Sequence, residues 1–210
     1  MPLDTSTVAT LWREVRGQVI LPDDPDYDEA RKVWNGMIDK RPAALVRAAR
    51  AEDVVPVLRV ARSAGLALAI RGGGHNVAGM GSVDDGLVLD MGDLRSVTVD
   101  PAAGLVRIEA GATLRDIDLA TEPHGLAVPI GVVSGTGIAG FTLGGGVGWQ
   151  TRAYGLAIDN LVSAEVVLPD GELVRADATS HPDLFWALRG GGGNFGVDRK
   201  STRLNSSHRT

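Results

Sequence analysis

The sequence predicts an α+β (α/β) fold of two lobes, with mixed sheets flanked by helices, that is not a Rossmann fold. Residues 42–70 read as a strand, a helix and a strand. Three glycine-rich stretches, at 71–76, 131–148 and 189–196, are separated by ordinary strand and helix patterns. Glycines on loops allow close approach of the backbone to a ligand, so three such loops indicate one long ligand contacted from several sides.

The N-terminal part is expected to be helical. In residues 5–15 the apolar side chains fall on one helical face, and residues 28–34 read as a short helix. We therefore separate residues 1–37, as an N-terminal helical segment, from a main domain at 38–197. Tyr27 and Trp34 are interpreted as packing residues.

The main domain opens with the unit that delivers the first glycine loop. Residues 42–49 form a predicted strand, acidic residues at 51–53 favour the start of a helix, and Gly65 is a good stop for it. The apolar run 66–70 then reads as a buried strand, after which the chain is Arg-Gly-Gly-Gly-His-Asn. A loop at the carboxyl end of a strand is a common place for ligand binding in α/β folds.

The rest of the domain has short strands and two further helices. Residues 86–90, 96–100 and 105–109 read as strands, and Thr113 caps a helix that runs through His124. A strand follows in 159–168, with a hairpin turn at 169–172, and a helix starts near His181. Both histidines are interpreted as surface or capping residues.

Residues 135–140 match the dinucleotide fingerprint G-x-G-x-x-G by letter. That motif must open a long helix after a strand. Here Gly144, Gly145, Gly146 and Gly148 follow, and glycine disfavours a continuing helix. The Rossmann interpretation is therefore rejected.

Composition and charge argue against several classes of protein and of binding site. The 210 residues are 44% hydrophobic, which is enough for a core, and the 28 glycines are clustered as in ligand loops. A net charge of −5 without a basic stripe argues against nucleic acid, and the absence of cysteine excludes disulfides and thiolate metal sites. No secretory signal or membrane-spanning stretch is visible, so a cytoplasmic protein without metal or membrane partners is expected.

Five segments, taken in order, resemble a known family. They are IRGGGHN, GLVLDMGDLRSVTVD, GFTLGGGVGW, YGLAIDNLVSAEVVLPDGE and HPDLFWALRGGGGNFGV. Together they resemble FAD-linked oxidases of the berberine bridge enzyme type, which carry the p-cresol methylhydroxylase-type (PCMH-type) FAD-binding domain. The resemblance covers residues 22–197.

The resemblance implies FAD as cofactor, with His75 bonded covalently to the 8α-methyl carbon of the flavin. Some relatives form a second bond through cysteine, but Val133 aligns there and the chain has no cysteine, so the link is through His75 alone. Arg71, Asn76 and Ser134 are candidates either for the pyrophosphate or ribityl chain or for structural roles. The remaining cofactor-binding candidates are Gly72, Gly73, Gly74, Thr136, Gly137, Thr142, Gly146 and Val197.

The function that this implies is an oxidase that takes hydride from a carbon bearing an amine or alcohol and reduces oxygen. The partners are then a small-molecule substrate and oxygen. One alternative is a flavin-dependent reductase or dehydrogenase on the same fold, resembling UDP-N-acetylenolpyruvoylglucosamine reductase. Another is an FAD-binding fragment without turnover. In this family the substrate wall and the catalytic base come largely from a later domain, so neither substrate nor base is assigned.

The resemblance stops at Val197. Relatives continue with an apolar, β-branched strand, whereas this chain continues with Asp-Arg-Lys-Ser-Thr-Arg-Leu-Asn-Ser-Ser-His. We interpret residues 198–210 as a non-native tail that resembles translated sequencing adapter, with a genuine basic tail as the alternative. From this interpretation we expect disorder from about Asp198, poor FAD affinity and no appreciable turnover.

Overall fold

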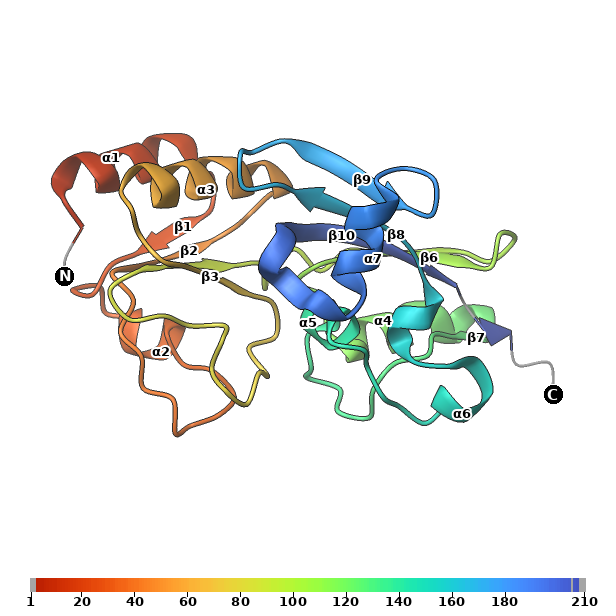
Figure 1. Cartoon of the computed structure of the whole chain (residues 1–210). Helices are drawn as coiled ribbons and strands as arrows, with labels where there is room; N and C mark the ends of the chain where they lie inside the picture. Colours follow the sequence, from red (N-terminus) through yellow and green to blue (C-terminus); the bar gives the residue numbers. More distant parts are fainter. Residues whose placement is uncertain (1–2, 205, 208–210) are drawn as a thin grey trace.

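The structure is a computed structural model that describes residues 3–204 and 206–207. It has two lobes, each built on its own sheet, and the glycine loops lie where the lobes meet (Figure 1). The prediction of a two-lobed α+β fold with mixed sheets and flanking helices is confirmed.

The first lobe holds a four-stranded sheet in the order β1-β2-β4-β3. Strands β2 and β3 run parallel to β4, and β1 is antiparallel to β2. The strands are β1 (Gln18–Ile20), β2 (Ala44–Arg47), β3 (Leu68–Arg71) and β4 (Leu87–Asp90). The carboxyl ends of three parallel strands therefore meet at one edge, and the first glycine loop leaves from that edge.

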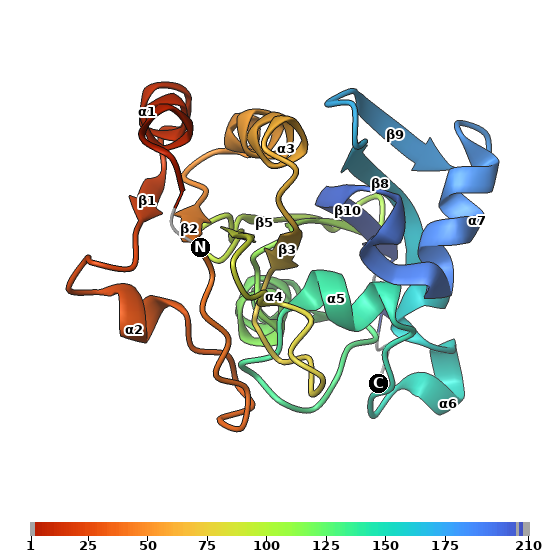
Figure 2. The ribbon, with the colours of Figure 1, turned by 60° about the vertical axis from the view of Figure 1, so that its left-hand side comes forward.

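Helices cover both faces of this sheet (Figure 2). On one face lie α1 (Thr5–Glu14), the 3₁₀ turn η1 (Ala51–Asp53) and α3 (Val54–Ser63). Val54 and Val57 of α3 are fully buried against Val46 and Leu89 of the sheet. On the other face lies the short α2 (Tyr27–Ala30), whose Tyr27 packs in a second apolar cluster.

A buried carboxylate joins three segments of the first lobe. The side chain of Asp53 has no exposed surface and accepts hydrogen bonds from the backbone N–H groups of Arg16, Gly17, Ala49 and Arg50, at 2.9–3.3 Å. These donors precede β1 and follow β2, so one carboxylate fixes both strand ends to the start of α3.

The second lobe holds a five-stranded antiparallel sheet in the order β5-β6-β10-β8-β9. The strands are β5 (Val97–Asp100), β6 (Leu105–Glu109), β8 (Leu161–Val167), β9 (Leu173–Asp177) and β10 (Val197–Leu204). The α-helices are α4 (Leu114–Thr121), α5 (Ile138–Leu143), α6 (Thr151–Tyr154) and α7 (Pro182–Gly191). Smaller pieces are the 3₁₀ turns η2 (Glu122–His124), η3 (Ala157–Asn160) and η4 (Gly192–Phe195) and the pair β7 (Leu126–Ala127) and β11 (Ser206–Ser207).

Some predicted elements are displaced or shortened for local reasons. The strand expected at 66–70 starts at Leu68, because the N–H of Leu66 still bonds the carbonyl of Ala61 at the end of α3. The helix expected at 28–34 ends at Ala30, because the N–H of Trp34 bonds the carbonyl of Gly74 instead of continuing the helix. In both places a bond outside the element defines its boundary.

The residues around Gly140 do not form a Rossmann unit. A helix begins at Ile138 and ends after six residues at Leu143, directly before the glycines that were expected to disfavour a continuing helix. A loop separates it from the two-residue strand β7, so the strand, turn and long helix of the fingerprint are not formed.

The expected disorder from Asp198 is wrong for the described residues 198–204. They form β10, which lies between β6 and β8 and pairs with both. The prediction sought apolar alternation, but a central strand gains backbone hydrogen bonds on both sides whatever its side chains are. Asp198, Ser201 and Arg203 are buried as a result. Residues 205 and 208–210 of the predicted tail lie outside the described part, and the non-native origin stays a prediction.

Among residues 3–204 and 206–207, no helix is both long enough and apolar enough to cross a bilayer.

Candidate functional site

The first two glycine loops touch through their backbones. A Cβ atom built on Gly73 would lie 2.3 Å from the backbone nitrogen of Gly137, and one built on Gly137 would lie 2.2 Å from the nitrogen of Gly73. Real Cβ atoms do not approach other atoms so closely, so only glycine fits at either position. The end of β3 in the first lobe is thereby held against the start of α5 in the second.

These loops carry backbone N–H groups that the protein itself does not use. Within the described part of the chain, no hydrogen bond engages the N–H of Gly73, Gly74, His75, Gly135 or Gly137. Gly74 has a left-handed φ of +67°. Runs of free N–H groups with such turns form concave binding sites for anions such as phosphate.

His75 lies between an aromatic ring and the second loop. Its imidazole stacks on Trp34, with ring centroids 5.3 Å apart and planes 21° from parallel. On the other loop, a Cβ built on Gly135 would lie 3.6 Å from Nε2 of His75. The imidazole is half-buried at the point where the two loops meet.

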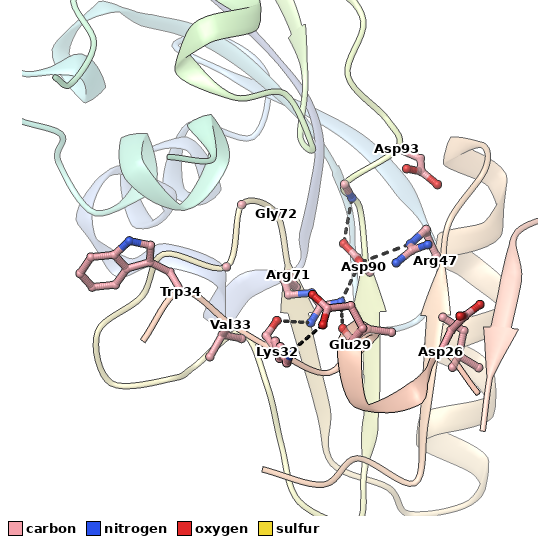
Figure 3. A pocket seen from close by; sticks show the side chains of 15 residues that line it. Asp26, Glu29, Lys32, Val33, Trp34, Arg47, Arg71, Gly72, Asp90 and Asp93 are labelled. Atoms are coloured by element: carbon pink, nitrogen blue, oxygen red, sulfur yellow. Dashed lines mark hydrogen bonds and ion pairs between the residues drawn. The ribbon is translucent and has the colours of Figure 1, made fainter. Parts of the chain in front are cut away.

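Arg71 braces the first loop through its buried side chain (Figure 3). Its Nη2 donates to the carbonyl of Ala30 and to Oδ2 of Asp90, both at 2.7 Å, and its Nη1 donates to the carbonyl of Lys32 at 3.2 Å. The guanidinium donates these hydrogen bonds to acceptors within the protein. Of the two roles considered for Arg71, cofactor contact and structural support, this arrangement favours structural support.

A cavity of 530 Å³ adjoins Gly72, Gly73 and Gly74 on the side of α2. Figure 3 shows that carboxylates line much of it: Asp26, Glu29, Asp90 and Asp93. All three of its cations are already paired, Arg71 and Arg47 with Asp90 and Lys32 with Glu29. Its lining therefore offers little to an anionic ligand.

The third glycine loop meets the same helix. Gly190, Gly192 and Gly196 have φ values of +115°, +67° and +151°, which only glycine adopts readily. The turn η4 inside this loop contacts α5. The structure therefore brings all three loops around α5, and their contact with one long ligand stays a prediction.

The other candidates are divided between exposed and buried positions. Ser134 and Asn76 are exposed, although the Oδ1 of Asn76 accepts the N–H of Met80 at 3.1 Å. Thr136 is partly buried, and both its N–H and its carbonyl are bonded within the protein. Gly146 has a φ of +77° and packs on Phe141 and Ala157, whereas Val197 packs in the core.

Thr142 lies in α5 and, with Arg203 and Asp198 of β10, is one of a cluster of buried polar side chains. It has no exposed surface, and its Oγ1 accepts a hydrogen bond from Nη1 of Arg203. Burial lowers the pKa of Arg203 to about 10 and raises the pKa of Asp198 to about 6, with the attraction between the two groups opposing each shift. Oδ1 of Asp198 and Nε of Arg203 have no hydrogen-bond partner among the described residues.

Sequence reasoning missed two residues of this site. Trp34 was interpreted as packing, yet 62% of its surface is exposed and it stacks on His75. The available signal was an aromatic residue placed directly before Asn-Gly, a dipeptide typical of turns. Gly135 was not singled out because its contact with His75 depends on tertiary structure.

Comparison with known proteins identifies the arrangement. A family profile described as "FAD binding domain" matches residues 42–177, well over half of the chain. The chain belongs to this family. It carries the PCMH-type FAD-binding domain of berberine-bridge-enzyme-like oxidases, as the order of the glycine motifs predicted.

Sequence and structure relatives agree on this assignment. The chain is 38% identical to (R)-6-hydroxynicotine oxidase of Paenarthrobacter nicotinovorans over 87% of its length and 40% of the relative's. It is also 38% identical to the FAD-linked oxidoreductase YgaK of Bacillus subtilis, covering 88% of this chain and 42% of that protein. The chain thus spans less than half the length of these curated relatives.

Solved structures superimpose closely. The crystal structure of 6-hydroxy-D-nicotine oxidase from Arthrobacter nicotinovorans matches with a TM-score of 0.90 at 36% identity, over 92% of this chain and 43% of that one. The BBE-like 1 protein of Physcomitrella patens matches with a TM-score of 0.91 at 29% identity, over 97% of this chain and 45% of that one. At these values the fold of the FAD-binding domain is shared.

Proposed function

We propose that this chain is the FAD-binding portion of an oxidase that takes hydride from a carbon bearing nitrogen or oxygen and passes the electrons to oxygen. The observation that carries the proposal is the backbone contact of Gly73 with Gly137 beside His75, with unused N–H groups on both loops. Relatives named as oxidases of 6-hydroxynicotine and of xylooligosaccharide support a small-molecule substrate.

The residues present fit FAD. Its pyrophosphate is an anion that needs hydrogen-bond donors, and the N–H groups of Gly73, Gly74, Gly135 and Gly137 supply them. The acidic cavity on the side of α2 does not suit it. A flat ring needs a close backbone wall, and loops in which a Cβ does not fit provide one. When bound, FAD supplies the hydride acceptor and the route of electrons to oxygen.

We further propose that His75 bonds the flavin covalently and alone. An imidazole nitrogen of His75 forms a bond to the 8α carbon, the carbon and the nitrogen each lose a proton, and the flavin takes up the electron pair, which oxygen then accepts. Support comes from a solved relative, glucooligosaccharide oxidase of Acremonium strictum, whose FAD is described as 6-S-cysteinyl, 8α-N1-histidyl. This chain has no cysteine, so only the histidyl bond is available.

Acid precipitation of the purified protein tests this proposal. We expect yellow colour to stay in the pellet of the wild type and to move into the supernatant with His75→Ala. His124→Ala is the matched control, because that histidine is exposed at the end of η2. If the wild type releases its flavin as readily as His75→Ala, the covalent bond is disproved.

The reaction of the reduced flavin with oxygen distinguishes an oxidase from the alternative, a reductase or dehydrogenase. The bound flavin is reduced anaerobically with light and then mixed with oxygen, which requires no knowledge of the substrate. An oxidase is expected to reoxidise faster than free FAD and to form hydrogen peroxide, whereas reoxidation no faster than that of free FAD favours the reductase class. Substrate turnover is not expected from this chain alone, because the remainder of the relatives' length is needed for it.

A further inference from the structure

Trp34 occupies a position that packing does not explain. Its indole is 62% exposed, so it is not a core residue, and yet it stacks on His75 with planes 21° from parallel. Figure 3 shows it at the far side of the cavity from Asp93, beyond Val33 and Gly72. Because most of the indole stays in solvent, burial alone does not account for its stacked position.

The cause lies in the backbone around the stack. The N–H of Trp34 donates to the carbonyl of Gly74 at 3.1 Å, which fixes the residue beside His75. Next to it, Nδ2 of Asn35 donates to the carbonyl of Val77 at 2.8 Å. The bonds from Arg71 to the carbonyls of Ala30 and Lys32 hold the same segment from the other end. Residues 30–35 are thus fastened to residues 71–77 at four points.

The imidazole is therefore restricted from two sides. The indole covers one side of it, and Gly135 lies near Nε2. A histidine in a glycine loop would otherwise sample several χ1 and χ2 rotamers, and only some of them aim a ring nitrogen in a given direction. Because the lone pair of that nitrogen lies in the ring plane, fixing the plane restricts the directions in which the nitrogen can form a bond.

We infer that Trp34 is a positioning residue for His75, which holds the imidazole plane so that a ring nitrogen meets the 8α carbon of the flavin. The inference rests on the proposed covalent attachment. An aromatic stack of this kind shifts a rotamer equilibrium by roughly two- to tenfold. Loss of the indole should therefore slow attachment by that factor, since the reacting geometry is reached less often.

The test measures attachment in protein purified without flavin. FAD is added, and acid-stable flavin is followed over time in the wild type, Trp34→Leu, Trp34→Phe and the control Trp12→Leu. Trp12 is a matched control because it is 61% exposed on α1 and makes no ring contact in the described part of the chain. We expect attachment roughly two- to tenfold slower in Trp34→Leu, an intermediate rate in Trp34→Phe, which keeps a ring, and no change in Trp12→Leu.

A second readout needs no flavin. In the NMR spectrum of the flavin-free protein, the ring protons of His75 should be shifted by the indole ring current, and Trp34→Leu should remove that shift. Attachment at the wild-type rate in Trp34→Leu, or an unchanged His75 shift, overturns the inference while leaving the proposed function intact. A wild type that forms no acid-stable flavin overturns the covalent attachment, and the positioning role with it.

Discussion

Replacing Gly137 by alanine should separate the two loops of the proposed cofactor site. The added Cβ would lie 2.2 Å from the nitrogen and 2.8 Å from the Cα of Gly73. Both are backbone atoms, so no side chain can move aside, and the loops must part by about 1 Å to reach ordinary contact. Overpacking of this kind costs about 1–3 kcal/mol. For a domain of this size that lowers the melting temperature by about 2–12 °C.

The same movement should weaken FAD binding. N–H donors on the two loops can reach one pyrophosphate only while the loops are in contact, and losing one hydrogen bond to a charged group costs about 1.5–3 kcal/mol. We expect the affinity to fall at least roughly tenfold. Thermal unfolding followed by fluorescence, and FAD titration in a His75→Ala background, measure the two effects separately.

Gly140→Ala is the control, because it makes the same chemical change three residues further along the chain, inside α5. A Cβ there meets no atom within 4 Å. Alanine favours a helix over glycine by about 1 kcal/mol, so this variant should be slightly more stable and bind FAD normally. If Gly137→Ala behaves like Gly140→Ala, the contact between the loops is not what forms the site.

Other substitutions test the supports of the site and the buried groups. Asp53→Ala leaves four backbone N–H groups without their acceptor and should lower the free energy of unfolding by about 3–5 kcal/mol, measured in urea; a loss below 1 kcal/mol would contradict the bonding described. Arg71→Lys keeps the charge but cannot bond three acceptors at once, so flavin attachment should slow and stability should fall by about 1–3 kcal/mol, whereas an unchanged attachment rate would exclude a bracing role. Asp198 has a folded-state pKa of about 6, above the ordinary 3.8, so it binds more protons in the folded chain and its contribution to stability is lost as the pH rises from about 4 to about 6. The free energy of unfolding in urea, measured at pH 4.5 and pH 7, should therefore change less between these pH values in Asp198→Asn than in the wild type. An equal change in both proteins would refute the buried position of Asp198. Replacing both buried charges together, with Asp198→Val and Arg203→Met, should stabilise the protein by about 1–4 kcal/mol at pH 7, and a loss of stability would show that the attraction between the two charges outweighs their desolvation.

Local patterns were sufficient for most elements and for the identity of the loops. The start of α4 followed from Thr113, whose N–H and hydroxyl both donate to Asp116 at 2.7 Å, and the glycine stretches marked the loops that are proposed to hold the cofactor. What could not be predicted depends on contacts between distant residues. The stack of Trp34 on His75 joins positions 41 residues apart, and its geometry is set by the carbonyl of Gly74.

The β10 strand also could not be predicted from local sequence patterns. Its sequence carries the charged residues Asp198, Arg199, Lys200 and Arg203, which disfavour a central strand. Two neighbouring strands with free edges impose an extended backbone nevertheless, and the unpaired atoms of Asp198 and Arg203 mark the cost. Prediction from one sequence uses the strand preferences of the side chains. It cannot show that β6 and β8 leave room for one more strand between them.

The place of β10 also determines when the second lobe can finish folding. It follows the other four strands of its sheet in the chain, yet it lies in the middle of that sheet, between the pairs β5–β6 and β8–β9. Until residues 197–204 leave the ribosome, both pairs keep an open edge, and open edges are where chains pair wrongly and aggregate. Pairing across nearly a hundred residues is slow as well. Expression of this domain should therefore respond to slower synthesis, lower temperature and chaperones more than a domain with a locally paired sheet would.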